Sequence, residues 1–444
     1  MKKRVSYSNL LDVQRENYKN FLVSGLKSRL HMIRKINHLF FNLYFHENNI
    51  KFKKPKFSPD IVLLKGQTYF LSLYIPLSVK YLKKKIVNKK YILLGKIPML
   101  TRTGSFLING NTRVLINQLV KSPGVYVEKD EIEKQVFVTI IPFMGSWLTL
   151  KCSKTNEISV KIDKMKVSIP ILIFLQAFGL TDKKLSYILL NLVKCDGLNK
   201  TLTSLSTLNM LITSEKLNKS NVRSFLFTKF INKYKYDLGA LGRLKLNKVL
   251  YLRKFYTTKS FLMPEDILGF TNFLLKKSYE KRGLENVDDL KNKSVRGNGD
   301  LLSFQLNLSI FELKNSIIEK LTSLNKKIQN LKFTNIDLDF NELVNSNILT
   351  KKIFSFFLNS QISQILDEIN PLSEITHKRK ITALGITGSK KTTNNLTIRE
   401  IHPSHFGKIC GIETSEGKNA GLILTFSREN RLNKFGFIET PFYV

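Results

Sequence analysis

Turn-forming residue pairs cut one long segment of this chain into short runs suited to β-strands. In YILLGKIPMLTRTGSFLINGNTRVLINQLVKSPGVYVE (91–128), the breaks fall at Gly104, at Asn109-Gly110 and at Pro123-Gly124. Pairs of this kind adopt the tight turns that connect neighbouring strands. The segment is therefore predicted to form several short strands joined by turns.

Further strand patterns flank this segment on both sides. TYFLSLYIPLSVKYL (68–82) alternates apolar and polar residues, which is the pattern of a strand with one buried face. Strands are expected to continue over residues 135–170, which contain the chain's single tryptophan in IIPFMGSWLTLKC. Residues 68–170 are thus predicted to be rich in β structure.

Helical patterns occupy other parts of the chain. Apolar residues recur at mixed three- and four-residue spacing over residues 8–50, and helical patterns return at 170–280 and 300–366. Thr181 and Asp182 are suitable N-cap residues, and Pro264 begins a first turn that carries two acids. The chain after about residue 365 returns to turns and short strands. This mixture predicts an α+β fold with interrupted domains.

The net charge indicates the class of partner. A chain of 444 residues with 43% hydrophobic content can bury the cores of two or three domains. It carries 72 Lys and Arg against 34 Asp and Glu, a net charge of +38. Such an excess favours a polyanionic partner, because each phosphate neutralised by a cation releases condensed counterions. The alternative explanation is an AT-rich genome, which enriches Lys and Asn codons throughout a protein.

Several classes of protein are disfavoured by the sequence. The most apolar run, IPILIFLQAFGL (169–180), is shorter than the roughly twenty residues that a membrane-spanning helix needs. The N-terminus lacks the apolar core and cleavage site of a signal peptide. Cys152, Cys195 and Cys410 are odd in number and far apart, which is typical of a reducing compartment rather than of a disulfide framework.

Signatures of catalytic or metal sites are sparse. His402, His405 and Cys410 lie close together in HPSHFGKIC, but a zinc site needs more ligands at tighter pairing, so a polar turn around Pro403 is the preferred interpretation. GITGSKKT (385–392) lacks the glycine that a phosphate-binding loop requires. No closely spaced set of carboxylates typical of a two-magnesium centre is evident. Neither a catalytic residue nor a metal ligand is therefore predicted.

The motifs of the chain resemble, in order, those of a known family. SQISQILDEINPLSEITHKRKITALG (360–385) and REIHPSHFGKICGIETSEGKNAGLI (399–423) closely resemble the central fork region of the β subunit of multisubunit bacterial-type RNA polymerase. GSFLINGNTRVLINQLVKSPGVYV, IIPFMGSWL, KYDLGALGRLKLNK, PEDIL and VDDLKNKSVRGNGDLL resemble earlier blocks of that subunit, and LLDVQRENYKNFL resembles its N-terminal helix. Because these blocks keep the family's order along nearly the whole chain, the resemblance is specific.

The resemblance implies an architecture. Residues 1–125 and 263–350 are expected to form a protrusion interrupted by a lobe at 126–262, and residues 351–444 to form the start of the fork region, truncated. Family β subunits continue beyond this point, so the chain is expected to be the N-terminal portion of a split plastid β subunit. Since the resemblance begins near Ser8, no transit peptide is expected. The protein is then expected to be made inside the plastid or chloroplast, and the bacterial cytoplasm is the alternative location.

The resemblance also implies a site. In the family, the stretch that corresponds to NPLSEITHKRKITALG (370–385) lines the path of the nascent RNA and forms the rifamycin pocket. Within it, HKRK (377–380) is expected to supply cations that meet phosphates. Pro371 and Gly385 are expected in the turns that present HKRK. The implied RNA-path residues are Gln364, Asp367, His377, Arg379, Lys380, Thr382, Leu384, Glu416 and Asn419. Lys390 and Lys391 are expected to contact nucleic acid from a fork loop. Lys380 and Ile365 depart from the family's usual arginine and phenylalanine, which is expected to weaken rifamycin inhibition.

The resemblance implies that chemistry occurs on other chains. The magnesium-binding aspartates are expected on a β′-type subunit, so no cofactor is expected here. Expected partners are the C-terminal β fragment, β′-type subunits, α subunits, a sigma-type factor, the DNA template and the nascent RNA, with no membrane. One alternative is a freestanding basic nucleic-acid-binding protein, which explains the charge but not the ordered blocks. A decayed gene fragment is the other alternative.

Overall fold

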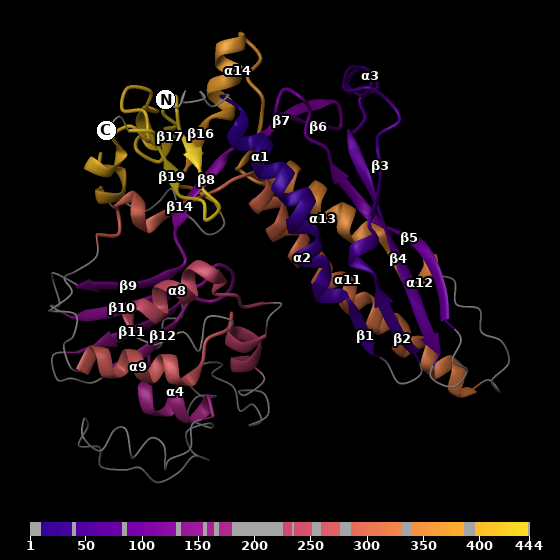
Figure 1. The fold of residues 1–444 in the computed structure, drawn as a ribbon, viewed down its shortest axis with the longest axis horizontal. Coiled ribbons are helices and arrows are strands. Elements are labelled where there is room, and N and C mark those ends of the chain that lie inside the picture. The colour runs from indigo at the N-terminus through magenta and orange to yellow at the C-terminus, as the bar shows by residue number, and fades with distance from the viewer. Residues whose placement is uncertain are drawn as a thin grey trace, which may run out of the picture. The chain divides into compact units, whose positions relative to one another are not determined.

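Helices and several separate β-sheets make up the protein (Figure 1). The computed structural model describes residues 10–37, 41–81, 87–129, 135–153, 158–163, 168–179, 225–232, 235–250, 259–275, 286–330, 340–385 and 396–442. The mixture confirms that the chain combines helical and β structure. The assignment of its parts as protrusion, lobe and fork stays a prediction.

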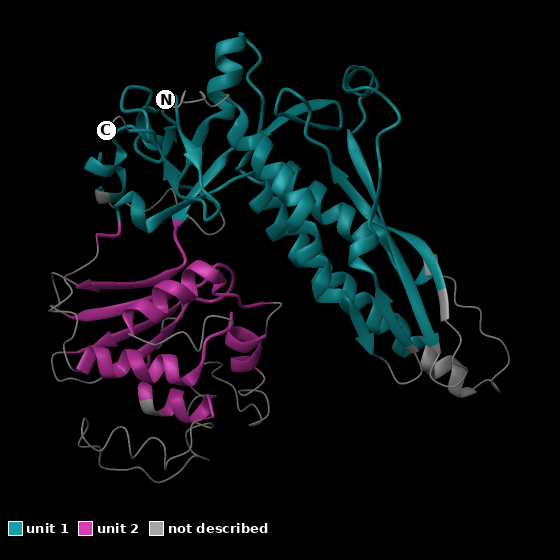
Figure 2. Cartoon of the chain, in the orientation of Figure 1, with its two compact units in different colours: residues 1–120, 288–444 teal, residues 121–287 magenta. Residues whose placement is uncertain are grey.

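The chain divides into two compact units (Figure 2). Residues 121–287 form one unit, and residues 1–120 together with 288–444 form the other. The discontinuous unit is called unit 1 below, and the contiguous one unit 2. One unit is thus inserted into the sequence of the other, with boundaries at 120/121 and 287/288.

Unit 1 begins with a helical segment that is shorter than the sequence pattern predicts. The helices α1 (Asp12–Asn20) and α2 (Leu26–Leu30) flank a π-helical turn, η1 (Phe21–Gly25), and a 3₁₀ turn, η2 (His31–Ile33), follows. The predicted helix over 8–50 is wrong after Ile33, because the chain continues as strands β1 (Lys35–Asn37) and β2 (Phe41–Phe45). Leu43 and Phe45 alternate with polar residues and are buried in the unit 1 core, which is the strand period of two.

A five-stranded antiparallel sheet forms the centre of this part of unit 1. Its longest strands are β4 (Phe70–Tyr81) and β5 (Val87–Pro98), paired along almost their whole length. β2 and the short β3 (Lys51–Lys53) both pair with β4 on its other edge, and β1 pairs with β2. The strand predicted over 68–82 is confirmed by β4.

Long helices cover one face of this sheet. α11 (Asn298–Asn330) and α13 (Ser346–Asn359) pack on each other, and α13 also packs on β5. The short helix α12 (Phe340–Leu343) lies between α11 and α13 in sequence. The buried leucines and isoleucines of α11 recur at three- and four-residue spacing and share one core with Leu73, Ile75 and Leu77 of β4. The helical structure predicted over 300–366 is confirmed for α11, α12 and α13, and residues 331–339 lie outside the described residues. The prediction is wrong for β15 (Ser363–Ile365), which pairs with β7.

A tight hairpin follows the large sheet. β6 (Phe106–Ile108) and β7 (Asn111–Leu115) are joined through Asn109 and Gly110, whose φ angles are 50° and 75°. Two consecutive positive φ angles are the conformation that an Asn-Gly hairpin turn adopts. The turn predicted at this pair is therefore confirmed.

A four-stranded sheet joins distant parts of unit 1. Its order is β14 (Lys293–Arg296), β8 (Asn117–Lys121), β16 (Lys380–Thr382) and β17 (Ile423–Thr425). β16 runs parallel to β8 and antiparallel to β17. A small hairpin of β18 (Arg431–Leu432) and β19 (Ile438–Glu439) follows. The sheet therefore holds β16 between β8, from the first third of the chain, and β17, from near its end.

The described part of unit 2 contains an antiparallel sheet, helices and a π-helical turn, η4 (Phe227–Ile231). The strands are β9 (Gly124–Lys129), β10 (Val136–Ile141), β11 (Leu148–Cys152), β12 (Ile158–Ile162) and β13 (Ile169–Pro170), in sequential order. The helices are α4 (Ile171–Ala177), α8 (Gly239–Val249) and α9 (Pro264–Leu275). The strands predicted over 135–170 and the helix start at Pro264 are confirmed. Thr181 and Asp182 lie outside the described residues.

A buried ion pair ties two helices of unit 2 together. Nη1 of Arg243, on α8, lies 2.7 Å from Oδ2 of Asp266, on α9, and both side chains are almost completely buried. The backbone N–H of Met263 donates to the same carboxylate oxygen at 2.9 Å, and Nε of Arg243 donates to the carbonyl of Lys259 at 3.0 Å. Both charges are thus matched by specific hydrogen bonds inside the core.

Within the described parts of the chain, every helix is too short or too polar to cross a membrane.

Candidate nucleic-acid interface

A short helix, α14 (Pro371–Lys378), lies at the centre of the stretch that the sequence singles out. Asn370 precedes it in an extended conformation, and its Oδ1 accepts the N–H of Ser373 at 2.7 Å. The Ser373 hydroxyl in turn accepts the N–H of Asn370 at 3.2 Å, which completes a reciprocal cap. Pro371 is therefore the first residue of a helix rather than part of the turn that was predicted, because proline suits this position.

His377 contacts two other predicted site residues. The N–H of Asp367 donates to Nδ1 of His377 at 3.2 Å, and Nε2 lies 3.1 Å from Oε1 of Gln364. Since Nδ1 accepts a hydrogen bond, the proton is on Nε2 and is donated to Gln364. Burial, and then the positive charge of Lys380, lower the pKa of His377 below its ordinary value. The ring is therefore a neutral connector between α14 and β15.

This geometry predicts a pH dependence of stability. A histidine whose pKa is lowered on folding binds fewer protons in the folded state than in the unfolded state. Its contribution to the free energy of unfolding is therefore complete above its pKa in the unfolded chain, about 6.5. That contribution is lost as the pH falls below this value. We expect the free energy of unfolding of unit 1 to decrease between pH 7 and pH 5, measured by urea titration. The decrease should be smaller in His377→Gln; an identical pH profile in the two proteins would contradict the assignment.

Arg379 is buried and bound to the backbone of distant segments. Its Nη1 donates to the carbonyl of Leu10 at 2.7 Å, and its Nη2 donates to the carbonyls of Ser427 and Arg428. Burial lowers the pKa of Arg379, with the nearby charge of Glu413 acting in the opposite direction. The guanidinium therefore holds the beginning of the described chain and the segment after β17 against the end of α14.

Lys378 has a similar internal position. It is 2% exposed, its Nζ lies 3.3 Å from the carboxylate of Glu374 one helical turn earlier, and its carbonyl accepts Nε2 of Gln14 at 2.6 Å. Of the four residues in HKRK, only Lys380 is partly exposed, since the first three are buried.

Two of the next three predicted residues, Lys380 and Thr382, lie on β16, and the third, Leu384, follows it. The carbonyl of Lys380 accepts Nδ2 of Asn117 at 3.3 Å, and the hydroxyl of Thr382 accepts the N–H of Leu384 at 3.1 Å. Gln118 donates to the carbonyl of Leu384 at 3.1 Å. Asn117 and Gln118 could not be identified from the sequence, because their role depends on the parallel pairing of β8 with β16.

Glu416 and Asn419 lie on a loop around the 3₁₀ turn η9 (Gly417–Asn419). Arg399, which the sequence analysis also missed, fastens this loop by donating from Nη1 to the carbonyls of Lys418 and Ala420, both at 3.1 Å. Glu416 is exposed, and the Oδ1 atom of Asn419 is buried with no hydrogen-bond donor among the described residues. The loop is thus held firmly while retaining an acceptor that has no partner in the described chain.

Exposed apolar side chains surround the start of α14. Ile365 is 62% exposed, Ile369 85% and Leu372 70%.

Lys390 and Lys391, predicted to contact nucleic acid, lie outside the described residues. Among the residues that the structure describes, no group of three or more His, Cys, Asp or Glu side chains could hold a metal ion.

The site lies inside a region that matches a known domain. Residues 364–431 match the family model described as RNA polymerase Rpb2, domain 3, and residues 121–296 match RNA polymerase Rpb2, domain 2. The first range includes every predicted site residue from Gln364 to Asn419, and the second begins at the same residue as unit 2.

Relatives extend the similarity to almost the whole chain. The chain is 43% identical to the DNA-directed RNA polymerase subunit beta of Euglena longa, over 99% of this chain and 41% of that protein. It is 41% identical to the Euglena gracilis subunit, over 98% and 40%, and 34% identical to the subunit of Thermosynechococcus vestitus, over 98% and 39%. The chain therefore spans about two fifths of the length of these relatives.

Proposed function

We propose, because this chain belongs to the family of RNA polymerase β subunits, that it forms the N-terminal portion of the β subunit of a DNA-dependent RNA polymerase. In this proposal the lobe (126–262) lies within unit 2, residues 1–125 and 263–350 form the protrusion, and residues 351–444 form the start of the fork region. Together they contribute one wall of the DNA cleft. The α14–β16–η9 region guides nascent RNA close to the active centre and corresponds to the rifamycin pocket.

One observation carries the proposal for the RNA path. The buried residues of the site, His377 and Arg379, bind only protein groups in the described chain, whereas Asp367 and Glu416 are exposed and Lys380 is partly exposed. RNA that advances through a channel needs contacts that exchange easily, presented by a framework that does not move. The buried set supplies the framework, and Lys380, the only cation of the exposed set, supplies the contact with phosphate.

The proposed chemistry is divided between chains. We propose that magnesium is held by a β′-type subunit, and we route no chemical step through a metal on this chain. The residues described above bind and orient RNA. The assembled enzyme would further contain the rest of β, α subunits and a sigma-type factor, with template DNA. We further propose a plastid location, which is supported by the similarity to the Euglena and cyanobacterial relatives; a bacterial cytoplasm is the alternative.

Lys380→Gln in the assembled polymerase tests the proposed RNA contact. We expect altered elongation, pausing or release of short RNA, because one charge-assisted contact worth about 1.5–3 kcal/mol is removed. This corresponds to roughly one to two orders of magnitude in the affected step. Synthesis of a dinucleotide should persist. Lys434→Gln, an exposed lysine of the same unit outside the site, is the control. Loss of dinucleotide synthesis in an intact complex with Lys380→Gln would overturn the proposed division of labour.

The second candidate function is a freestanding nucleic-acid-binding protein, which the charge of +38 favours. Affinity capture of the tagged chain from its native source distinguishes the two functions. A polymerase subunit brings down large β′-type and α-type chains in fixed proportion. Nucleic acid without such chains would favour the second candidate.

A further inference from the structure

We infer that the face of the five-stranded sheet opposite α11 and α13 binds single-stranded nucleic acid. This face is called the outer face below, and it belongs entirely to unit 1. The inference goes beyond the proposed function, since it uses none of the residues of the α14–β16–η9 region. The residues considered are Lys35, Tyr44, Lys51, Lys53, Phe70, Tyr74, Lys80, Lys89, Tyr91 and Lys96.

The strand register defines which side chains share the outer face. Leu73, Ile75 and Leu77 of β4 are fully buried in the core beneath the helices. Because side chains alternate along a strand, the residues between them, Tyr74 among them, point to the other side. Pairing extends this assignment across the sheet, since a residue lies on the same face as its cross-strand partner.

Lysine and tyrosine side chains fill the cross-strand rows of the outer face. In one row Lys35 pairs with Tyr44, Tyr44 with Ser78, and Ser78 with Lys89. In a second row Lys51 pairs with Tyr74, and Tyr74 with Leu93. Three steps between neighbouring strands of about 4.8 Å make the first row about 14 Å wide. This width suits an extended oligonucleotide rather than a single phosphate.

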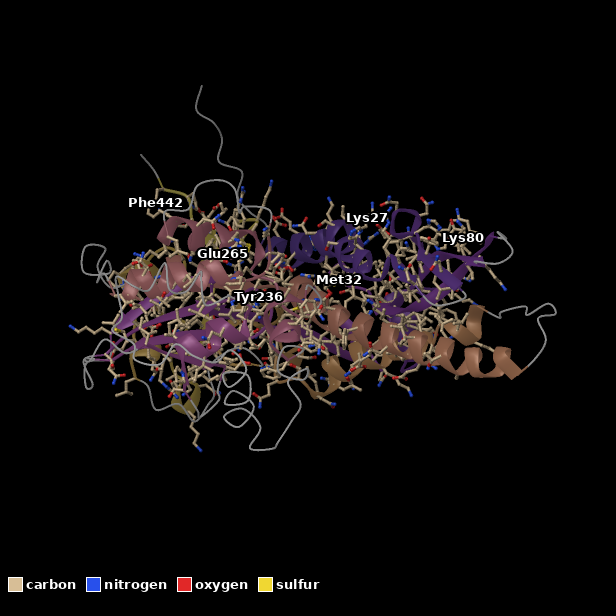
Figure 3. The ribbon with its side chains drawn as sticks, turned by 90° about the horizontal axis from the view of Figure 1, so that it is seen from below. Lys27, Met32, Lys80, Tyr236, Glu265 and Phe442 are labelled. Carbon is tan, nitrogen blue, oxygen red and sulfur yellow. The ribbon has the colours of Figure 1, made fainter. Side chains whose placement is uncertain are left out.

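A third row repeats the basic pattern, because Lys53 pairs with Ser72 and Ser72 with Lys96. The lysines Lys51, Lys53, Lys80 and Lys89 are exposed, and Lys80 is labelled in Figure 3. The sequences of the five strands contain no Asp or Glu. The outer face therefore presents cations without neutralising carboxylates on its own strands.

Aromatic rings lie directly beside these cations. Nζ of Lys51 is 4.3 Å from the centre of the Tyr91 ring, and Nζ of Lys96 is 4.5 Å from that of Phe70. Nζ of Lys35 is 5.7 Å from the centre of the Tyr44 ring. These cation–π contacts hold the ammonium groups close to the sheet, and Tyr91 remains 41% exposed. The face thus combines ordered cations with an accessible ring.

This combination matches the chemistry of a single strand. Phosphates are met by lysine ammonium groups, and unpaired bases stack on aromatic rings, which is how sequence-tolerant binders of single strands work. An anionic membrane also attracts lysines, but insertion into lipid requires exposed large apolar side chains. The large apolar side chains of the outer face, Phe70 and Leu93, are only partly exposed. The lysines Lys51, Lys53, Lys80 and Lys89 are exposed, so nucleic acid is the better occupant.

Binding of a fluorescent oligothymidylate to the full chain, measured by anisotropy over a salt series, tests the inference. The first variant combines Lys51→Gln, Lys53→Gln and Lys89→Gln. Its matched control combines Lys19→Gln, Lys27→Gln and Lys351→Gln, three exposed lysines on α1, α2 and α13. We expect the first variant to lower the slope of log affinity against log salt by about two, from three lost contacts with a single strand. The control should keep the original slope.

A second pair of variants separates stacking from charge. Tyr91→Leu should weaken binding roughly tenfold, and Tyr91→Phe should restore it, because only the ring is needed for stacking. Circular dichroism checks that each variant is folded. Lys434→Gln, an exposed lysine outside both the outer face and the α14–β16–η9 region, should leave this binding unchanged.

Three outcomes would overturn the inference. Equal loss in the two lysine triplets would show that affinity follows total charge. Unchanged affinity in Tyr91→Leu would remove the role of stacking. Phosphatidylglycerol vesicles that displace the oligonucleotide, and that lose binding in the same variants, would assign the outer face to a membrane surface instead.

Discussion

Replacing Asp266 with alanine is expected to lower the free energy of unfolding of unit 2 by about 3–5 kcal/mol. The substitution leaves the Arg243 guanidinium buried without its carboxylate, and it also removes the acceptor of the Met263 N–H. An uncompensated charge in a core costs far more than the ion pair itself contributes, because water cannot reach it. Chemical denaturation of the full chain, followed by hydrogen exchange within α8 and α9, measures the change.

Glu265 provides a matched control for this experiment. It is the preceding residue in the same first turn of α9, it is exposed, and it is labelled in Figure 3. Glu265→Ala should change stability by less than about 0.5 kcal/mol, as most surface substitutions do. Asp266→Asn keeps a hydrogen-bond acceptor without the charge and should fall between the two. Similar stabilities of Asp266→Ala and Glu265→Ala would contradict the buried-pair interpretation.

Arg379→Ala is expected to destabilise unit 1 by about 3 kcal/mol, although the residue lies in the stretch assigned to RNA. The carbonyls of Leu10, Ser427 and Arg428 lose a charged donor, and hydrogen bonds to charged groups contribute about 1.5–3 kcal/mol each before water replaces them. Hydrogen exchange should increase around Leu10 and Ser427. The same experiment reports whether the chain still unfolds cooperatively.

Arg379→Lys separates this structural role from direct contact with RNA. A lysine keeps the charge but presents a single ammonium group in place of the planar fork, so it cannot reach all three carbonyls. Stability should therefore fall in Arg379→Lys as well. If Arg379 contacted phosphate instead, the lysine variant would keep both its stability and most of its activity in elongation.

Local signals in the sequence predicted the elements that depend on neighbouring residues. The alternation in 68–82, the Asn109-Gly110 turn and the helix start at Pro264 each depend on a few adjacent positions, and the structure contains all three. The helix α14 was missed although its signals are local too. Asn370 before Pro371 is a good N-cap followed by a good first helical residue, and this pair was interpreted as a turn.

The internal contacts of the site could not be predicted from the stretch itself. Arg379 is satisfied by Leu10 and Ser427, and β16 is positioned by Asn117, all of which are far away in sequence. A run of four basic or titratable residues gives no indication of which members face inward. The same limit explains the wrong helix over 35–50, where pairing with β4 outweighs the helical spacing of apolar residues.

The parallel pairing of β8 with β16 has a consequence for the order in which the chain acquires its structure during synthesis. Residues 122–379 separate the two strands, and ribosomes add roughly 5–20 residues per second. β16 is therefore synthesised on the order of 13–50 s after β8. Meanwhile residues 121–287 already have all the strands of their own core and can form it. Leu119, which is buried in the finished protein in one core with Ile381 of β16, would lack this neighbour during that interval. A chaperone that shields β8 until β16 arrives would raise the yield of folded chain more than one that acts on the completed chain.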